Sequence, residues 1–172
     1  MTRTRLSPDT WVSAGFEALV AAGPAALAAE PLARALGSTK GSFYWHFKDV
    51  PAFQDALLAT WQTRALEQVV VAVSATGEAE IRLREFGQAV LRDPVEPKLR
   101  AWAQSDARPA KVLADVDTER QHLLGRLLTT LGLGNADFAR ALQATLIGLP
   151  LLGRASDTSP FDTLVDTILA LD

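Results

Sequence analysis

Hydrophobic residues recur every three or four positions along nearly the whole chain, which is the spacing of an α-helix with one buried face. No convincing stretch alternates between apolar and polar residues as a half-buried strand does. The pattern therefore predicts an all-α fold of about nine helices. We expect these helices to span approximately residues 9–22, 28–35, 39–46, 49–74, 81–91, 97–102, 110–131, 136–152 and 160–171.

Residues that favour helix ends support several of these boundaries. Either Ser7 or Asp9 is expected to cap the first helix. Thr39 stands where it would cap the third helix, and Asp49 stands where it would cap the fourth. Pro109 predicts a break before the long helix that follows it, because proline lacks the backbone N–H of a helix interior.

The composition excludes several classes of chemistry. The 172-residue chain contains no cysteine, so it forms no disulfide and offers no thiolate to a metal or a substrate. It has two histidines and no glycine loop of the kind that cradles phosphate, so we expect neither an enzyme nor a bound cofactor or metal. The beginning of the chain lacks the apolar core of a signal peptide, and residues 141–152 are too few to span a bilayer. These features predict a cytoplasmic protein.

The charge is distributed unevenly along the chain. A formal net charge of −3 argues weakly against a broad nucleic-acid-binding surface. However, residues 1–55 carry five basic and five acidic residues, so the acid excess belongs to residues 56–172. Residues 31–48 contain three basic residues and one histidine but no acidic residue. An anionic partner is therefore expected to dock at this window.

Residues 28–46 have the outline of a helix-turn-helix, which is two short helices joined by a tight turn that contains glycine. On a helical wheel, Phe43 and Phe47 define the buried side of the second helix, where Leu32 and Leu36 join them. The opposite side carries Gly41, Ser42 and Trp45, and the flanks carry Tyr44 and His46. Aromatic residues on an exposed arc are typical of a docking surface.

Each residue type on this arc suits contact with duplex DNA. Gly41 lets the backbone approach the duplex closely, and Thr39 is expected to cap the helix and to offer the helix's N-terminal amides to a phosphate. Lys40 and Trp45 have the reach and chemistry for base edges. The other donors expected at phosphates are Ser42, Tyr44, His46 and Lys48, with Arg3 and Arg5 as an arm along the backbone or minor groove. The alternative is a structural helical corner that carries its aromatic residues by chance.

Residues 9–61 resemble the DNA-binding domain of the TetR family of bacterial transcriptional repressors. The matching residues are Leu32-Ala33, Leu36-Gly37, Thr39-Lys40-Gly41-Ser42, Phe43-Tyr44-Trp45-His46-Phe47 and the apolar start of the fourth helix. The resemblance implies a helix-turn-helix DNA-binding domain over residues 1–50 and a helical ligand-binding and dimerisation domain over residues 51–172. Two departures stand out, since family members usually have Ser or Thr at the position of Ala28 and lysine at that of Val50.

The second domain supplies candidates for a ligand pocket and a dimer interface. Trp61, Phe86, Trp102 and His122 are candidate pocket residues, although aromatic residues at helical spacing are more often simple core. The last two helices are predicted to pair with those of a second subunit in a four-helix bundle. The interface residues would be Phe138, Leu142, Leu146, Leu149, Phe161, Leu164, Val165 and Ile168. The alternative is that these side chains are buried within one subunit.

The sequence and the resemblance together predict a ligand-responsive transcriptional repressor. It would bind a near-palindromic DNA operator as a homodimer and leave it when a small-molecule inducer binds. An activator of the same design is an open alternative. A second hypothesis is a helical small-molecule sensor or adapter that does not read DNA, which the departures at Ala28 and Val50 and the lack of net positive charge favour.

Overall fold

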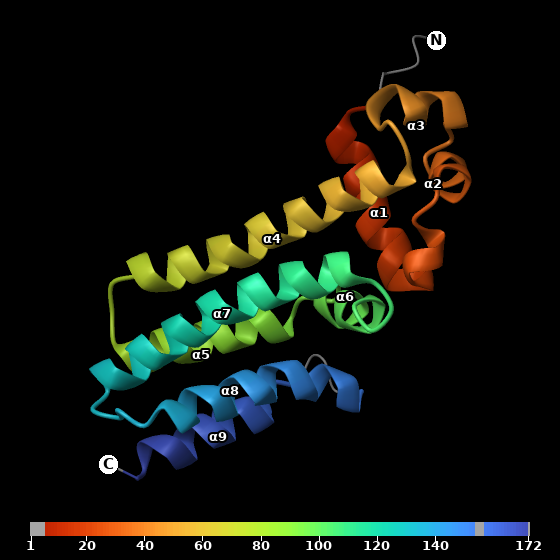
Figure 1. Cartoon of the computed structure of the whole chain (residues 1–172). Coiled ribbons are helices and arrows are strands. Elements are labelled where there is room, and N and C mark those ends of the chain that lie inside the picture. The colour runs from red at the N-terminus through yellow and green to blue at the C-terminus, as the bar shows by residue number, and fades with distance from the viewer. Residues whose placement is uncertain (1–5, 154–156, 172) are drawn as a thin grey trace. The chain divides into compact units, whose positions relative to one another are not determined.

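The computed structural model describes residues 6–153 and 157–171, and within these ranges the chain is all-α (Figure 1). The all-α prediction is confirmed: the described residues form nine α-helices and two short 3₁₀ helices, with no strand. They are α1 Pro8–Ala22, η1 Pro24–Ala26, α2 Ala29–Ala35, α3 Lys40–His46, α4 Val50–Ser74, α5 Ala79–Leu91, α6 Glu96–Trp102, α7 Ala107–Thr130, α8 Ala136–Gly148, η2 Leu149–Leu152 and α9 Ser159–Leu169. None of these helices is long and apolar enough to cross a membrane.

Side-chain caps fix the beginnings of the first, third and fourth α-helices where the sequence predicts them. The Ser7 hydroxyl accepts a hydrogen bond from the Thr10 amide at 3.2 Å. Thr39 Oγ1 accepts from the Ser42 amide at 3.2 Å, and Asp49 Oδ1 accepts from the Ala52 amide at 2.8 Å. Each cap satisfies an amide that has no partner within its own helix.

Two predicted helix boundaries are wrong for reasons of local chemistry. Pro109 does not break α7 but lies in its first turn, where a missing N–H removes no helical hydrogen bond. Asp106 Oδ1 instead accepts from the Arg108 amide at 2.9 Å immediately before this turn. At the other end of the chain, α8 stops at Gly148 rather than near residue 152, and the chain tightens into η2 around Pro150.

The described chain divides into two compact units. Unit 1 takes the part up to residue 61 together with residues 98–112, and unit 2 takes residues 62–97 and those from 113 onward. Both α4 and α7 therefore run through the two units. These compact units do not follow the expected functional division between residues 50 and 51, which stays a prediction.

The core of unit 1 packs aromatic rings from α1, α3 and α4 together. Phe43 makes edge-to-face contacts with Trp11 at 5.4 Å and with Phe53 at 5.3 Å between ring centroids. The backbone of α1 approaches α4 closely at Gly15, where a Cβ atom would lie 2.7 Å from side-chain atoms of both Phe53 and Leu57. A larger residue at position 15 would therefore push the two helices apart.

The segment 98–112 is held in unit 1 by Arg108, whose guanidinium is a hub of polar contacts. It bonds Asp106 at 2.6 Å, Gln54 at 2.9 Å and Asp55 at 3.3 Å, and its central carbon lies 5.8 Å from the Trp102 ring centroid. The hydrogen bonds from Arg108 lower the pKa of the Asp106 carboxyl below its ordinary value. Asp106 and Arg108 are close neighbours in the sequence, whereas the contacts with Gln54 and Asp55 join this segment to a distant part of the chain.

The core of unit 2 gathers α5, α7, α8 and α9 around large apolar side chains. Gly87 on α5 leaves room for the ring of Phe161 on α9, which a side chain at position 87 would occupy. On the surface, Arg84 bonds Glu80 at 2.8 Å and Asp166 at 2.5 Å, so one guanidinium joins α5 to α9. The buried members of this core include Leu83, Phe86, Val90, Leu123, Leu124, Leu127, Leu128, Leu142, Leu146, Phe161, Val165 and Ile168.

A buried ion pair links α6 to α7 within unit 2. Arg120 Nη1 lies 2.8 Å from Glu96 Oε2, and the two side chains are 2% and 6% exposed. Burial of two charges is costly, and their mutual attraction roughly offsets that cost only while both are present. The pair therefore holds Glu96 against Arg120 of α7 more than it adds to net stability.

Replacement of Glu96 by glutamine should strongly destabilise the protein, because it leaves the buried Arg120 guanidinium without its carboxylate. We expect a cost of about 3–5 kcal/mol and a thermal midpoint lower by at least about 6 °C in a denaturation curve. The matched change at exposed Glu85 should leave the midpoint nearly unaltered. The double variant Arg120→Met with Glu96→Leu should recover most of the loss, and a failure to recover would show that the pair itself is stabilising.

Candidate nucleic-acid interface

The turn between α2 and α3 is short and closed by backbone hydrogen bonds. The Ser38 amide donates to the Ala33 carbonyl at 2.8 Å, and the Gly37 amide donates to the Arg34 carbonyl at 3.2 Å. Gly37 adopts a φ of 57°, a left-handed conformation that side chains disfavour. These contacts fix the angle between the two helices, and the predicted helix-turn-helix outline is present (Figure 1).

The inner side of α3 is anchored by Phe43, which is fully buried. Its ring contacts rings from α1 and α4 and also packs against Phe47, with 5.3 Å between centroids. Leu32 of α2 is likewise fully buried, whereas Leu36 is only half-buried. The predicted buried direction of α3 is therefore the observed one.

The outer side of α3 exposes two aromatic rings. Trp45 is 70% exposed and Tyr44 is 50% exposed, which are high values for such large apolar side chains. Lys40 and Lys48 are exposed on the same short segment, and Ser42 is half-buried. Because Phe43 is locked in the core, this outer surface is held in one orientation.

Gly41 and His46 differ in how well they fit the predicted interface. A Cβ atom at Gly41 would make only an ordinary contact, 3.8 Å from Thr39 Oγ1, so nothing in the described structure requires glycine there. Gly41 therefore does not serve close packing between helices within the described structure. His46 is half-buried, and its Nε2 is buried without a hydrogen-bond partner, so this nitrogen is not presented to a phosphate.

An acidic residue that precedes the basic window lies beside it in space. Glu30, the second residue of α2, accepts from Lys40 Nζ at 2.7 Å and from Arg34 Nη2 at 3.2 Å. The hydrogen bond and charge of Lys40 lower the pKa of the Glu30 carboxyl, and the same bond raises the pKa of the Lys40 ammonium. Helix geometry at i and i+4 signals the contact with Arg34. The contact with Lys40 depends on the turn, which the sequence pattern did not resolve.

The two compact units carry opposite net charges. By formal count, unit 1 contains nine basic and six acidic residues, and unit 2 contains eight basic and fourteen acidic residues. The net charges are therefore +3 and −6. The unit that contains α3 is the one that long-range electrostatics would draw toward an anionic polymer.

The remaining predicted contacts are Arg3 and Arg5, which lie outside the described residues. Ala28 precedes α2 and makes no side-chain cap, because its methyl group cannot accept a hydrogen bond. Val50 is the half-buried first residue of α4. Neither position therefore supplies a side-chain donor to the proposed interface.

The four candidate pocket residues are divided between the two units. Trp61 and Trp102 belong to unit 1, whereas Phe86 and His122 belong to unit 2. The three aromatic residues are almost fully buried, and His122 is exposed. The interpretation of the two tryptophans as core is thus favoured by their burial.

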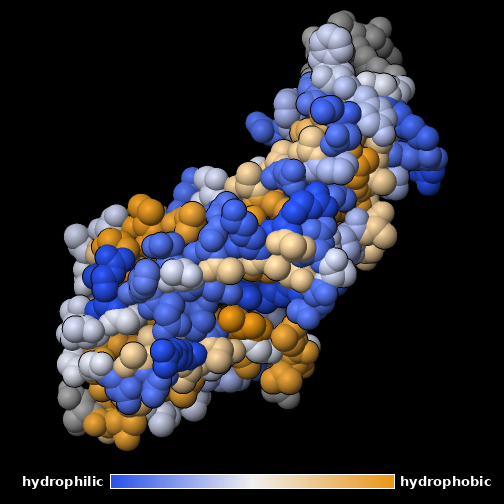
Figure 2. Space-filling model, viewed as in Figure 1, coloured by the Kyte–Doolittle hydropathy of each residue, from blue (hydrophilic) through white to orange (hydrophobic). Residues whose placement is uncertain are grey.

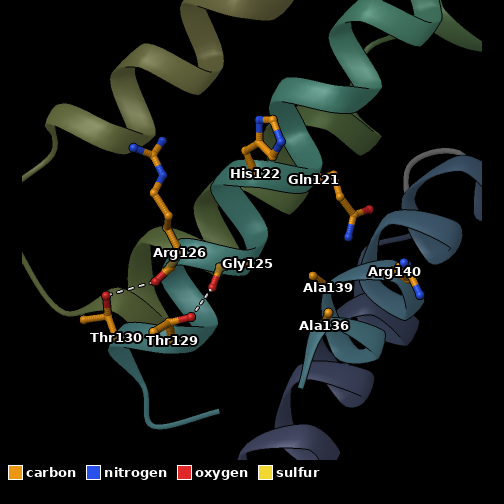
Figure 3. A pocket seen from close by; sticks show the side chains of 9 residues that line it. All are labelled: Gln121, His122, Gly125, Arg126, Thr129, Thr130, Ala136, Ala139 and Arg140. Carbon is orange, nitrogen blue, oxygen red and sulfur yellow. Dashed lines mark hydrogen bonds between the residues drawn. The ribbon is translucent and has the colours of Figure 1, made fainter. Parts of the chain in front are cut away.

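Two hollows of ligand size are lined entirely by described residues of unit 2. The larger, of about 880 Å³, lies between α7 and α8 and is drawn in Figure 3. Gly125, Ala136 and Ala139 leave it wide, while the side chains of Arg126 and Arg140 point away from each other at its edges (Figure 3). His122 lines this groove, which places one predicted residue at a concave surface.

The second hollow, of about 390 Å³, lies between α4 and α5. Phe86 lines it together with Val71, Ala72 and Ala89. Gln68 also lines it, and the Oε1 atom of this residue is buried without a hydrogen-bond partner. A buried acceptor without a donor is uncommon, because the loss of its hydration is not compensated. No pattern in the sequence points to Gln68.

Most of the predicted dimer-interface residues are buried within the chain itself. Six of them belong to the core of unit 2: Leu142, Leu146, Leu149, Phe161, Val165 and Ile168. Phe138 and Leu164 are partly buried against the same core. The amphipathic pattern was interpreted correctly as a buried face, but that face packs within one subunit.

Among the described residues, no group of three or more histidine, aspartate or glutamate side chains is placed to hold a metal ion. The sequence matches no established protein-family profile and no curated protein.

Solved structures, in contrast, share the fold over nearly the whole chain. A transcriptional regulator from Rhodococcus sp. Rha1 aligns with a TM-score of 0.79 and 19% identity, over 96% of this chain and 95% of that one. The reduced form of NemR from E. coli aligns with a TM-score of 0.74 and 18% identity, over 94% of both chains. A protein described as a TetR-family transcriptional regulator from Rhodococcus sp. aligns with a TM-score of 0.74 and 19% identity, over 94% and 98%. The chain therefore has the fold of TetR-type transcriptional regulators.

Proposed function

We propose that this chain is a ligand-responsive transcriptional repressor that binds a near-palindromic DNA operator as a homodimer. The observation that supports DNA binding most directly is the outer side of α3, where Tyr44 and Trp45 are exposed while Phe43 holds the helix in the core. The positive charge of unit 1 and the names of the structural neighbours point the same way. The proposal makes the protein a regulator rather than an enzyme.

In the proposed complex, α3 enters the major groove with its outer side toward the bases. Lys40 and Trp45 reach base edges, and the Trp45 ring also suits a thymine methyl group. Tyr44, Ser42 and Lys48 donate to phosphates and set the register. The bare Gly41 lets the backbone come close to the duplex. We assign His46 a smaller share than the sequence suggested, because its Nε2 is buried.

Response to a ligand requires that the ligand bind one conformation better than the other. Since α4 runs through both units, a change in its second half is carried to the half that packs beside α3. We place the ligand in the hollow between α4 and α5, whose volume falls in the range of small-molecule sites. Gln68 Oε1 would accept a hydrogen bond from the ligand, and Phe86 would contact its apolar part.

Selection of bound duplexes from random DNA tests the proposal directly. We expect a two-fold symmetric consensus, because a symmetric dimer reads two equivalent half-sites. Tyr44→Ala and Trp45→Ala should each weaken binding to that consensus by roughly tenfold or more, and Trp45→Ala should do so with an unchanged thermal midpoint, since its side chain is 70% exposed. Ala114→Ser, an exposed change on α7, serves as the neutral control. Failure to enrich any sequence would favour the sensor or adapter that does not read DNA.

For the dimer, we propose the outward face of α8 and the adjoining η2 turn as the contact surface. Ala141 and Ala144 are exposed on this face, and the small side chains would allow close helix packing. Leu151 and Leu152 of η2 are 64% and 76% exposed. Figure 2 shows hydrophobic surface where α8 runs into this turn. A second copy of the chain would cover these side chains.

Ala144→Arg should convert the dimer to a monomer in sedimentation at micromolar concentration, because a charged side chain would enter the packed face. Ala114→Arg makes the same change at an exposed position of α7 and should leave the dimer intact. A wild-type protein that sediments as a monomer would contradict the dimer, and loss of the dimer in both variants would contradict this choice of face.

The ligand site is tested by filling each hollow with the same side chain. Ala89→Phe should occupy the hollow between α4 and α5, and Ala136→Phe should occupy part of the groove between α7 and α8. In cells with a reporter behind the selected operator, we expect Ala89→Phe to keep repression but to lose its release by a compound that releases the wild type. If only Ala136→Phe lost its release from the operator by the compound, the ligand site would instead be the groove between α7 and α8.

A further inference from the structure

Glu30 lies at the edge of the proposed DNA interface and pairs with the first residue of α3. Its carboxylate bonds Lys40 Nζ at 2.7 Å and Arg34 Nη2 at 3.2 Å, with all three side chains more than half exposed. An exposed ion pair of this kind adds little to folding stability, because water solvates the separated charges nearly as well. In the proposed complex, its main effect is to place a negative charge beside the DNA phosphates.

The pair changes what Lys40 offers to DNA. An unrestrained lysine is a flexible point charge that binds any nearby phosphate. With one of its three N–H donors held by Glu30, the Lys40 ammonium stays near the α2 side of α3 and keeps two donors for a further acceptor. Guanine presents such acceptors, O6 and N7, at the floor of the major groove.

The pair also lowers the local positive charge. Glu30, Arg34 and Lys40 together carry one net positive charge rather than the two of the basic residues alone. This difference acts at distances well inside the screening length of about 8–10 Å at physiological salt. Random duplex, which binds through phosphates alone, is affected most by such a loss.

We propose that Glu30 is a specificity-determining residue, which holds Lys40 toward one base edge and suppresses phosphate-driven binding to random DNA. The inference rests on the proposed function and deepens it, since it concerns selectivity at the same interface. When a duplex of another sequence approaches, the Lys40 ammonium is already paired with Glu30 and is not free to bind a phosphate. The operator supplies an acceptor that the held ammonium reaches without leaving Glu30.

The test compares Glu30→Gln with Glu119→Gln in the full-length protein. Both remove one negative charge, but Glu119 is an exposed residue of α7 in unit 2. For Glu30→Gln, we expect affinity for random duplex to rise about three- to tenfold at about 50 mM salt. Affinity for the selected operator should change by less than about twofold, so that selectivity falls. Glu119→Gln should leave the ratio of the two affinities unaltered.

Salt dependence separates the proposed role from a purely structural one. If Glu30→Gln frees Lys40 for one more phosphate, the slope of log K against log salt for random duplex becomes steeper by about 0.9. The gain in affinity should then shrink about threefold or more between about 50 and about 200 mM salt. A change in α2 packing alone would leave this slope as it is.

A second variant shows whether Lys40 carries the effect. Lys40→Met in the Glu30→Gln background should abolish most of the gain for random duplex, because the freed ammonium is then absent. Equal tightening on operator and random duplex, or an unchanged slope, would overturn the role of Glu30 while leaving DNA binding in place. Absence of binding to any duplex by the wild type would overturn the proposed function and this inference together.

Discussion

The presentation of α3 depends on the burial of a single ring, that of Phe43. A helix of seven residues has too few internal hydrogen bonds to persist alone in water, so its position must come from packing. Phe43 supplies that packing by contacting rings from α1, α4 and α3 itself. The exposure of Trp45 on the opposite side follows from this anchor, because a short helix held at one side can only turn its other side outward.

Much of the fold was accessible from the sequence because helix ends and helix faces follow local rules. Ser7, Thr39 and Asp49 cap the helices that they were expected to cap, and the buried face of α3 follows the spacing of its aromatic residues. The prediction at Pro109 was wrong because proline breaks a helix at an interior position but is favoured in the first turn of a helix. Only the position of the preceding cap, Asp106, distinguishes the two cases.

The site was harder to predict wherever it depends on residues that are distant in sequence. An apolar stripe on α8 shows that one face is buried, but not whether the covering side chains belong to the same subunit, as they do at Leu142 and Leu146. Likewise, a basic window without acidic residues says nothing about Glu30, which the turn brings beside Lys40. Hydrophobic periodicity shows which face of a helix is buried, but it does not show which element or subunit packs against that face.

The sharing of α4 and α7 between the two units has a consequence for how such a protein is divided or recombined. The chain crosses from one unit to the other three times, near residues 61, 97 and 112, so neither unit is a continuous piece of sequence. A fragment that stops after α4 would lack the segment that Arg108 ties to Asp55. One residue inserted into α4 would rotate everything beyond it by about 100° while α7 kept its original phase. A chimera with a relative must therefore keep the number of residues in both α4 and α7, so that the helical phase of each is preserved.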